Sequence, residues 1–374
     1  MTEIAVVTKF DIGDMWEQMP TYTKRANDLG MSITEVYRAS ALFYQQGLDT
    51  NEMMALSNET LKMARIAGLD AAEATDRMTA ALRGFNMELN QASAQKVADV
   101  YSKLAAITAS DVDEISTAMT KTASIAASAG MEFETTAAFL SQIIETTRES
   151  AETAGTAMKT VIARFQELKK SPNEIGEVDG EIVDANAIES ALRSVGVSLR
   201  DASGQFRELD DVFLELSSKW DSLDTNTQRY ISTIAAGSRQ QSRFISMMHD
   251  YERTQELVAA ANNSAGASQE QYDKTLDSLE TKLTKLDNAW TEFSTGLMNS
   301  DFVKFSVDFL TSILNGLTKV TEGFGSFTGS LSKVGTLVAI FQTAKVIISN
   351  FFDEVISKVY TSATRVGDSI ARGV

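Results

Sequence analysis

The sequence predicts an all-α protein made of elongated helical repeats and a coiled coil, with one small β-hairpin. Only two prolines, Pro20 and Pro172, occur in 374 residues, so long stretches are free to be helical. Apolar residues recur at helical spacing through most of residues 31–262, and glycines stand where these runs stop. A seam of large apolar residues at alternating steps of four and three then indicates a coiled coil.

Changes in composition divide the chain into six segments. We expect an N-terminal segment (1–30), a repeated helical block (31–170), an acidic loop and β-hairpin (171–210), a second helical block (211–265), a coiled-coil helix (266–300) and apolar glycine-hinged helices (301–374).

Capping residues set the helix boundaries in the repeated block. Possible N-caps are Asp49, Asp70, Asn90 and Ser110, and helices are expected to stop at Gly30, Gly47, Gly68 and Gly130. The predicted helices span residues 31–46, 51–67, 71–85, 91–106, 111–129, 132–147 and 149–170.

An internal repeat relates two parts of this block. Gly47-Leu48 and the helix after it align with Gly130-Met131 and its helix, and Met78 aligns with Met158 after a slip of three residues. A weaker third copy spans residues 212–244. Such repeats extend a fold along one axis, and chance similarity between alanine-rich helices is the alternative.

The middle of the chain is predicted to change character at Pro172. Residues 171–186 are acidic and contain glycine, which indicates a surface loop. A short helix at 187–194 is followed by residues 197–209, whose alternation around Asp201-Ala202-Ser203-Gly204 predicts a β-hairpin turning on Gly204. Helices are expected again at 211–220, 225–236 and 238–262.

The residue inventory argues against catalysis. There is no Cys and a single His, His249, which removes disulfides and makes His-based zinc sites and nucleophilic systems improbable. Adjacent carboxylates at Asp210-Asp211 and at Asp111, Asp113 and Glu114 could bind a metal or act as acid and base. Because they adjoin predicted helix starts, we expect them instead to interact favourably with the helix dipole. We therefore predict no catalytic residue, cofactor site or metal site, and no enzymatic activity.

Two further segments have the composition of ligand-binding loops but lack the residue spacing that such loops require. Asp179-Gly180-Glu181 with Asp184 lacks the alternating ligands of a calcium loop, so a solvated turn is expected. The glycines from Gly323 to Gly329 are not followed by the Lys-Ser/Thr of a phosphate loop, so a hinge is expected there.

The net charge of −17 is concentrated in the first 300 residues. An acidic surface repels phosphate backbones, so we expect no sequence-specific nucleic-acid binding. Acidic charge that merely keeps a helical protein soluble is the other explanation.

The coiled-coil seam cannot bury its apolar face alone. It needs either another copy of the chain, giving a homo-oligomer, or another segment of the same chain. Its residues are Tyr272, Leu276, Leu279, Leu283, Leu286, Trp290, Phe293 and Leu297.

The apolar region after the seam is predicted to form two amphipathic helices joined by glycines. Lys345 interrupts the run from Val334 to Phe352, which argues against a constitutive membrane span. These helices would either meet a membrane or pack together in a soluble bundle. The residues singled out are Phe302, Gly316, Gly323, Gly325, Gly329, Ile340 and Ile347.

Residues 191–244 resemble the core of phage tail tape measure proteins. The resemblance is carried by Ala191-Leu192, Gly196 to Asp201, Gly204 to Asp211, Trp220, Ala235 to Gln240 and Phe244. The stretch from Ser278 to Leu317 is similar to the part that comes next in that family, and the resemblance covers roughly residues 30–320. Members of the family are usually much longer, which indicates either a fragment or a ruler in another chain.

The resemblance implies a structural virion protein, synthesised in the host cytoplasm, that lies in the tail tube lumen or tail tip. It would set tail length during assembly and be released to assist DNA passage through the host envelope. Implied partners are further copies of itself, tail tube and baseplate or tail-tip proteins, and the host membrane on ejection. An α-helical pore-forming, membrane-active protein is the alternative from another class.

Overall fold

The computed structural model describes residues 12–167, 175–178, 181–276, 284 and 288. All of them belong to the first of two compact units, which spans Met1–Phe302, and the second unit spans Val303–Val374. The predicted apolar hinge, from Phe302 to Ile347, therefore lies outside the described residues.

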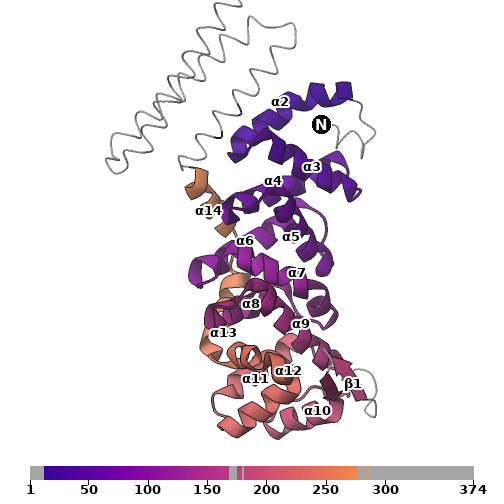
Figure 1. The fold of residues 1–374 in the computed structure, drawn as a ribbon, viewed down its shortest axis with the longest axis vertical. Coiled ribbons are helices and arrows are strands. Elements are labelled where there is room, and N and C mark those ends of the chain that lie inside the picture. Colours follow the sequence, from indigo (N-terminus) through magenta and orange to yellow (C-terminus); the bar gives the residue numbers. More distant parts are fainter. Residues whose placement is uncertain (1–11, 168–174, 179–180, 277–283, 285–287, 289–374) are drawn as a thin grey trace, which may run out of the picture. The chain divides into compact units, whose positions relative to one another are not determined.

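Helices dominate the described residues, so the all-α prediction is confirmed (Figure 1). The helices are α2 (Ile12–Leu29), α3 (Ile33–Gln45), α4 (Thr50–Ala67), α5 (Ala71–Gly84), α6 (Gln91–Ile107), α7 (Val112–Ser128), α8 (Phe133–Thr147), α9 (Ala151–Glu167), α10 (Ala185–Ser194), α11 (Leu209–Trp220), α12 (Thr225–Met248), α13 (Tyr251–Asn262) and α14 (Ala267–Leu276). Two short strands, β1 (Ile175–Val178) and β2 (Glu181–Asp184), pair antiparallel.

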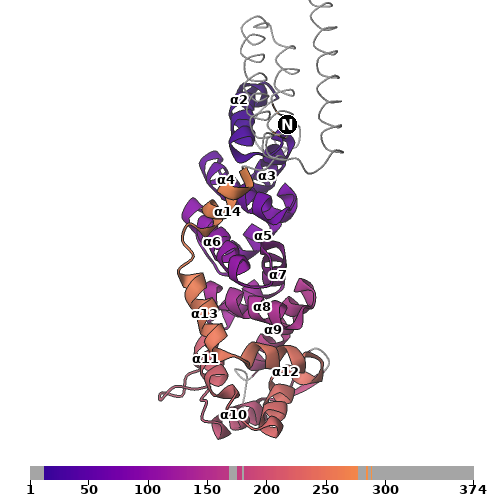
Figure 2. The ribbon, with the colours of Figure 1, turned by 90° about the vertical axis from the view of Figure 1, so that its left-hand side faces the viewer.

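The helices from α2 to α9 pack in two parallel rows, which we call the array. In one row α3, α5, α7 and α9 each contact the next, and in the other α2, α4, α6 and α8 do the same. Helix α12 then packs on α8 and α9. Figures 1 and 2 show the array helices following one another in chain order.

The chain then turns back along the array. Helix α13 packs on α8 and α6, and α14 packs on α6 and α4, so the order of contacts runs opposite to the order of synthesis (Figure 2). We call residues 250–276, which contain α13 and α14, the return segment.

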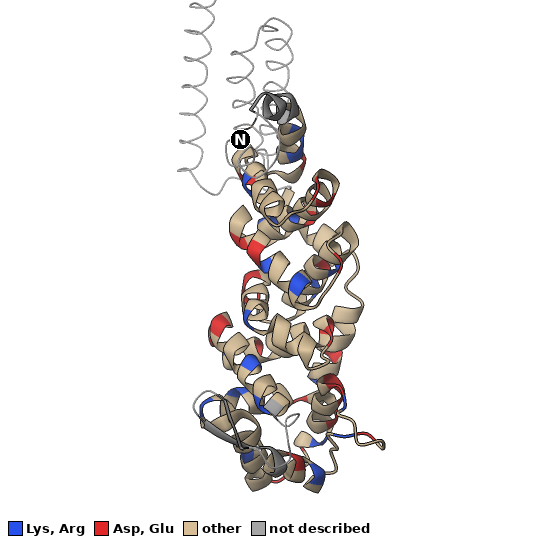
Figure 3. Cartoon of the chain, turned by 90° about the vertical axis from the view of Figure 1, so that its right-hand side faces the viewer, with Lys and Arg blue, Asp and Glu red and all other residues tan. Residues whose placement is uncertain are grey.

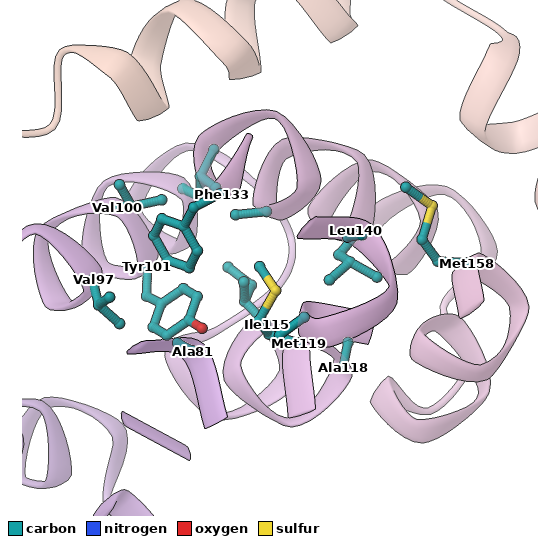
Figure 4. Close-up of a cluster of buried hydrophobic side chains, with 14 of the residues drawn as sticks. Ala81, Val97, Val100, Tyr101, Ile115, Ala118, Met119, Phe133, Leu140 and Met158 are labelled. Carbon is teal, nitrogen blue, oxygen red and sulfur yellow. The ribbon is translucent and has the colours of Figure 1, made fainter. Parts of the chain in front are cut away.

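Aromatic and aliphatic side chains fill the space between the rows. The rings of Tyr101 and Phe133 meet edge to face with their centroids 5.5 Å apart, and Ile115, Met119 and Leu140 complete this part of the core (Figure 4). All five side chains are buried. Burial of such side chains is the main force that holds a helical array together.

Glycine allows α9 to approach α7 closely. A Cβ atom added at Gly155 would lie 2.5 Å from the carbonyl oxygen of Ala118, and the Thr122 hydroxyl donates to the Gly155 carbonyl oxygen at 3.0 Å. Any larger residue at position 155 would therefore force these two helices apart.

Helix starts agree with the predicted caps in three places out of four. Asp49, Asp70 and Asn90 are the N-caps of α4, α5 and α6, and each accepts main-chain N–H groups of its helix. The prediction of Ser110 is wrong by one residue, because Asp111 caps α7 in a reciprocal pair with Glu114. An aspartate accepts the exposed N–H groups of the first turn and also favours the helix dipole.

The predicted internal repeat has a counterpart in the helix boundaries. Helices α4 and α8 begin at residues 50 and 133, and α5 and α9 begin at 71 and 151, so the offset changes from 83 to 80. Helix α4 has 18 residues and α8 has 15, which accounts for the slip of three. The slip is thus a shorter helix and not a change in the connecting loop.

The β structure differs from the prediction. The turn at Gly204 is present, but a single bridge between Arg200 and Phe206 closes it, so the expected pair of strands is not shown there. Strands β1 and β2 instead lie in the segment expected to be a loop. Asp179-Gly180, a dipeptide favoured in tight hairpins, stands between them in the sequence and was the available signal.

One helix prediction also needs correction. The predicted helix 238–262 is broken at Asp250, which has a φ of 60° and caps α13. The N-terminal segment 1–30 contains α2, and Pro20, which has no main-chain N–H to donate, lies inside this helix. The expected break at Gly237 is present, with φ 75° and ψ 169°.

Candidate functional site: the return segment on the array

The structure describes only the start of the predicted coiled-coil seam. Tyr272 and Leu276 lie on α14 and pack against the array of their own chain, so a coiled coil is not shown. Whether the seam joins two copies of the chain stays a prediction. The remaining seam residues, Leu279, Leu283, Leu286, Trp290, Phe293 and Leu297, lie outside the described residues.

Asp99, on α6, holds the beginning of α14. Its side chain is only 3% exposed. Its Oδ2 accepts the Gly266 N–H at 2.9 Å, and its Oδ1 accepts the Ser268 N–H at 2.9 Å together with the Ser268 hydroxyl. A buried carboxylate is stable only with such donors, so Asp99 acts as an N-terminal cap supplied by a distant helix.

Two further side chains fix the position of α14 along the array. The Gln271 side-chain amide donates to the Ser102 carbonyl oxygen at 2.7 Å, and the Tyr272 hydroxyl donates to the Asp28 carbonyl oxygen at 2.9 Å. Burial raises the pKa of Tyr272, which keeps its hydroxyl protonated as a donor. Because these bonds reach α6 and α2 at the same time, they specify one register for the helix.

A lysine on α4 joins the same contact. The Lys62 ammonium donates to the side-chain carbonyl of Gln269 at 2.9 Å and lies 3.3 Å from the buried carboxylate of Glu59. The same nitrogen lies 5.9 Å from the centre of the Tyr272 ring, within the range of a cation–π contact.

Asn288 extends the contact to the beginning of the array. Its side chain is 1% exposed; its Oδ1 accepts the Ile33 N–H at 3.2 Å, and its amide donates to the Met31 carbonyl oxygen. The chain has therefore returned to the α2–α3 junction by residue 288.

Helix α13 is held by a second set of polar contacts. The Arg253 guanidinium donates to the Ile107 carbonyl oxygen at 2.6 Å and to the Glu145 carboxylate at 3.0 Å. The Thr254 hydroxyl donates to the side-chain oxygen of Gln142 at 2.8 Å, and the Gln142 amide donates to the His249 carbonyl oxygen at 2.6 Å. These contacts join α13 to α8 and to the end of α6.

A buried carboxyl group connects α11 to the array. Asp210 is 8% exposed, and its Oδ2 accepts the Glu132 N–H at 2.7 Å at the start of α8. Burial raises the pKa of Asp210 to about 7, and the nearby carboxylates of Glu132 and Asp211 act in the same direction. The Glu132 N–H and the Thr135 side chain lower this pKa but do not outweigh the effect of burial.

The other carboxylates singled out from the sequence cap a helix or pair with an arginine. Asp111 and Glu114 cap α7, and Asp113 pairs with the Arg77 guanidinium. His249 is exposed and pairs with Asp221. Within the described ranges, no three His, Cys, Asp or Glu side chains come together in a way that could hold a metal ion.

The charge of the described surface and the hydropathy of the described helices bear on binding to nucleic acids and to membranes. Figure 3 shows acidic and basic residues distributed over many of the described helices. In the part of the chain that the structure describes, no helix combines the length and apolar character needed to cross a membrane.

The sequence reasoning missed the residues that hold the return segment. Asp99 offered one signal, since it is a lone carboxylate inside the apolar run Val97 to Val100. Gln142, Glu145 and Asn288 carry no local signal, because their partners lie more than 100 positions away.

The described residues define an all-helical protein in which stacked helices are covered by the returning helices α13 and α14. The family model described as "Phage-related minor tail protein" matches residues 22–237, and the chain belongs to this family. The match begins inside α2, includes the rest of the array and continues to Gly237, where α12 is broken.

Two curated relatives carry more specific names. The tape measure protein of Pneumococcus phage Dp-1 is 24% identical over 340 residues, covering 87% of this chain and 28% of the relative. The probable tape measure protein of Escherichia phage P2 is 24% identical over 292 residues, covering 75% of this chain and 33% of the relative. The predicted resemblance to phage tail tape measure proteins is confirmed.

The chain spans a third or less of the length of these relatives. No solved structure matches it.

Proposed function

We propose that the chain acts as a phage tail tape measure protein, a non-enzymatic structural component of the tail interior. In this role the whole protein sets tail length during assembly and is released to assist DNA passage through the host envelope. The observation that carries the proposal is the family match over residues 22–237, which includes most of the array and its continuation into α12.

The fold supports a scaffold role. The carboxylates considered for acid–base chemistry instead cap helices or join them, as Asp111 and Asp210 do. Contacts between residues far apart in sequence, such as Asp99 with Ser268, tie the array into one unit. Further copies of the chain, tail tube proteins and tail-tip proteins are its proposed partners.

Geometry limits how this part contributes to length. A straight helix adds about 1.5 Å per residue, so all 374 residues drawn out would reach roughly 560 Å. The packed array uses its residues in many short helices and contributes far less. In a protein as long as the relatives, two thirds or more of the length lies outside the part matched by this chain. Most of the ruler length would then come from that remaining part.

An in-frame deletion in the parent phage tests the proposal. Removing residues 130–165 takes out α8 and most of α9, on which α12 and α13 pack. We expect tails to be absent or to lose their defined length, as measured by electron microscopy, with tube diameter unchanged. The intact gene supplied from a plasmid should restore normal tails.

Tails of normal length and number that lack the protein, as judged by mass spectrometry of purified virions, would overturn the proposal. Detection of the protein in purified tails, with its loss accompanied by loss of length control, would support both the location and the role.

A further inference from the structure

The contacts of the return segment bring the two ends of the described fold together. Helix α2 begins the array, and Tyr272 on α14 donates its hydroxyl to the Asp28 carbonyl oxygen of α2. Asn288 binds the main chain at Met31 and Ile33. A force that pulls the two ends of this fold apart therefore acts first on the contacts between α2 and α14. The contacts of α8, α11 and α12 are loaded only after those of α13.

The return segment is held less firmly than the array beneath it. In α14 only Ser268 and Tyr272 are buried, and in α13 only Thr254, Leu257 and Ala261 are. Helix α8, with 15 residues, has twelve buried ones. Elements with few buried apolar contacts open at lower free energy than the core.

The order of contacts determines how force would be distributed. From residue 288 back to residue 250, the partners are α2–α3, then α4 and α6, then α6 and α8. Tension on the chain after α14 acts on these contacts one group at a time, so they break in sequence from α14 towards α13. Tension applied along the array would load the helix interfaces and the return segment in parallel.

The geometry points to a mechanical role: the return segment is a clasp that peels from the array under tension, starting at α14, before the array unfolds. Asp99 is the main latch, because it binds two main-chain N–H groups and one hydroxyl at the start of α14. This property belongs to the chain itself and stands whether or not the protein sets tail length.

Single-molecule pulling on the full chain tests the clasp. The chain has no Cys, so paired cysteines introduced at exposed positions give unique attachment points. One variant carries Lys24→Cys and Lys274→Cys, which places the load across α2 and α14. The other carries Lys24→Cys and Asn226→Cys, which places it across α2 and α12.

For the first variant we expect an early event that releases about 25 residues, or at most roughly 90 Å of extended chain. A larger event from the array should follow at higher force. The second variant should lack the early event. A single rupture of the whole fold in the first variant, or the same early event in both, would overturn the clasp.

Substitution of the latch gives an independent test. Asp99→Ala in the first variant should raise the rate of the early event roughly 5- to 30-fold, because it removes a cap. Asp70→Ala is the matched control, since Asp70 caps α5 inside the array and accepts from Ala72 and Glu73. It should weaken the later event and leave the early one unchanged; the opposite pattern would refute the role of Asp99.

Discussion

The stability of the fold should depend on pH through one buried carboxyl group, that of Asp210. Its pKa is about 7 in the folded state, mainly because burial disfavours the charged form, against an ordinary value of 3.8. Between these two values the folded state holds a proton that the unfolded state has lost. Stability therefore falls as pH rises through this window, and the loss is complete above pH 7.

The size of the effect follows from the two pKa values. From pH 5 to pH 8 the carboxyl group of Asp210 should remove about 2.5 kcal/mol from the free energy of unfolding. Asp210→Asn abolishes the titration, and its side-chain oxygen can still accept the Glu132 N–H. The free energy of unfolding of the variant, relative to that of the wild type, should therefore increase by this amount from pH 5 to pH 8. This is equivalent to about 5–10 °C in melting temperature.

Thermal melting followed by circular dichroism at pH 5 and pH 8 measures this difference. Asp211→Asn is the control, because Asp211 is the exposed neighbour on the same helix turn. If the melting temperatures of the wild type and of Asp210→Asn change by the same amount between pH 5 and pH 8, burial of a titrating carboxyl group at this position is refuted.

Three other variants test separate parts of the chain. Gly155→Val should destabilise the fold by about 2–3 kcal/mol in urea unfolding, because it overpacks the α7–α9 contact, whereas a change at an exposed position of α9 should have little effect. If the seam joins copies of the chain, changing Leu283 and Leu286 to Asp should dissociate the oligomer in light scattering; a monomeric wild type would favour the intramolecular partner instead. Changing Ile340 and Ile347 to Glu should leave tails assembled and reduce potassium efflux from infected cells, because charge on a lipid-facing helix opposes insertion. Unchanged efflux would assign these helices to packing.

The helices of the array could be predicted from the sequence because their signals are local. Asp49 and Asp70 bind N–H groups within their own first turns, and glycines such as Gly68 adopt the left-handed conformation that ends a helix. The break before α13 escaped prediction, because Asp250 takes a positive φ that aspartate adopts less often than glycine.

The position of the return segment could not be read from the same signals. The seam predicts that α14 needs a partner helix. The spacing of Tyr272 and Leu276 is the same whether that partner is a second copy of the chain or α4 of the same chain. What decides the matter is a set of pairs such as Asp99 with Ser268 and Gln142 with Thr254, whose members are separated by more than 100 residues. Polar pairs of this kind leave no periodic trace in a single sequence.

The return segment also has a consequence for how the protein is made. Asp99 and Ser268 are 169 positions apart, so at about 5–20 residues per second the ribosome needs on the order of 10 to 30 s to supply the partner of a carboxylate already synthesised. During that interval α4, α6 and α8 present an uncovered face on a nascent chain. We expect chaperones that recognise apolar surface to bind this face, and synthesis of chains that stop before residue 250 to yield aggregates.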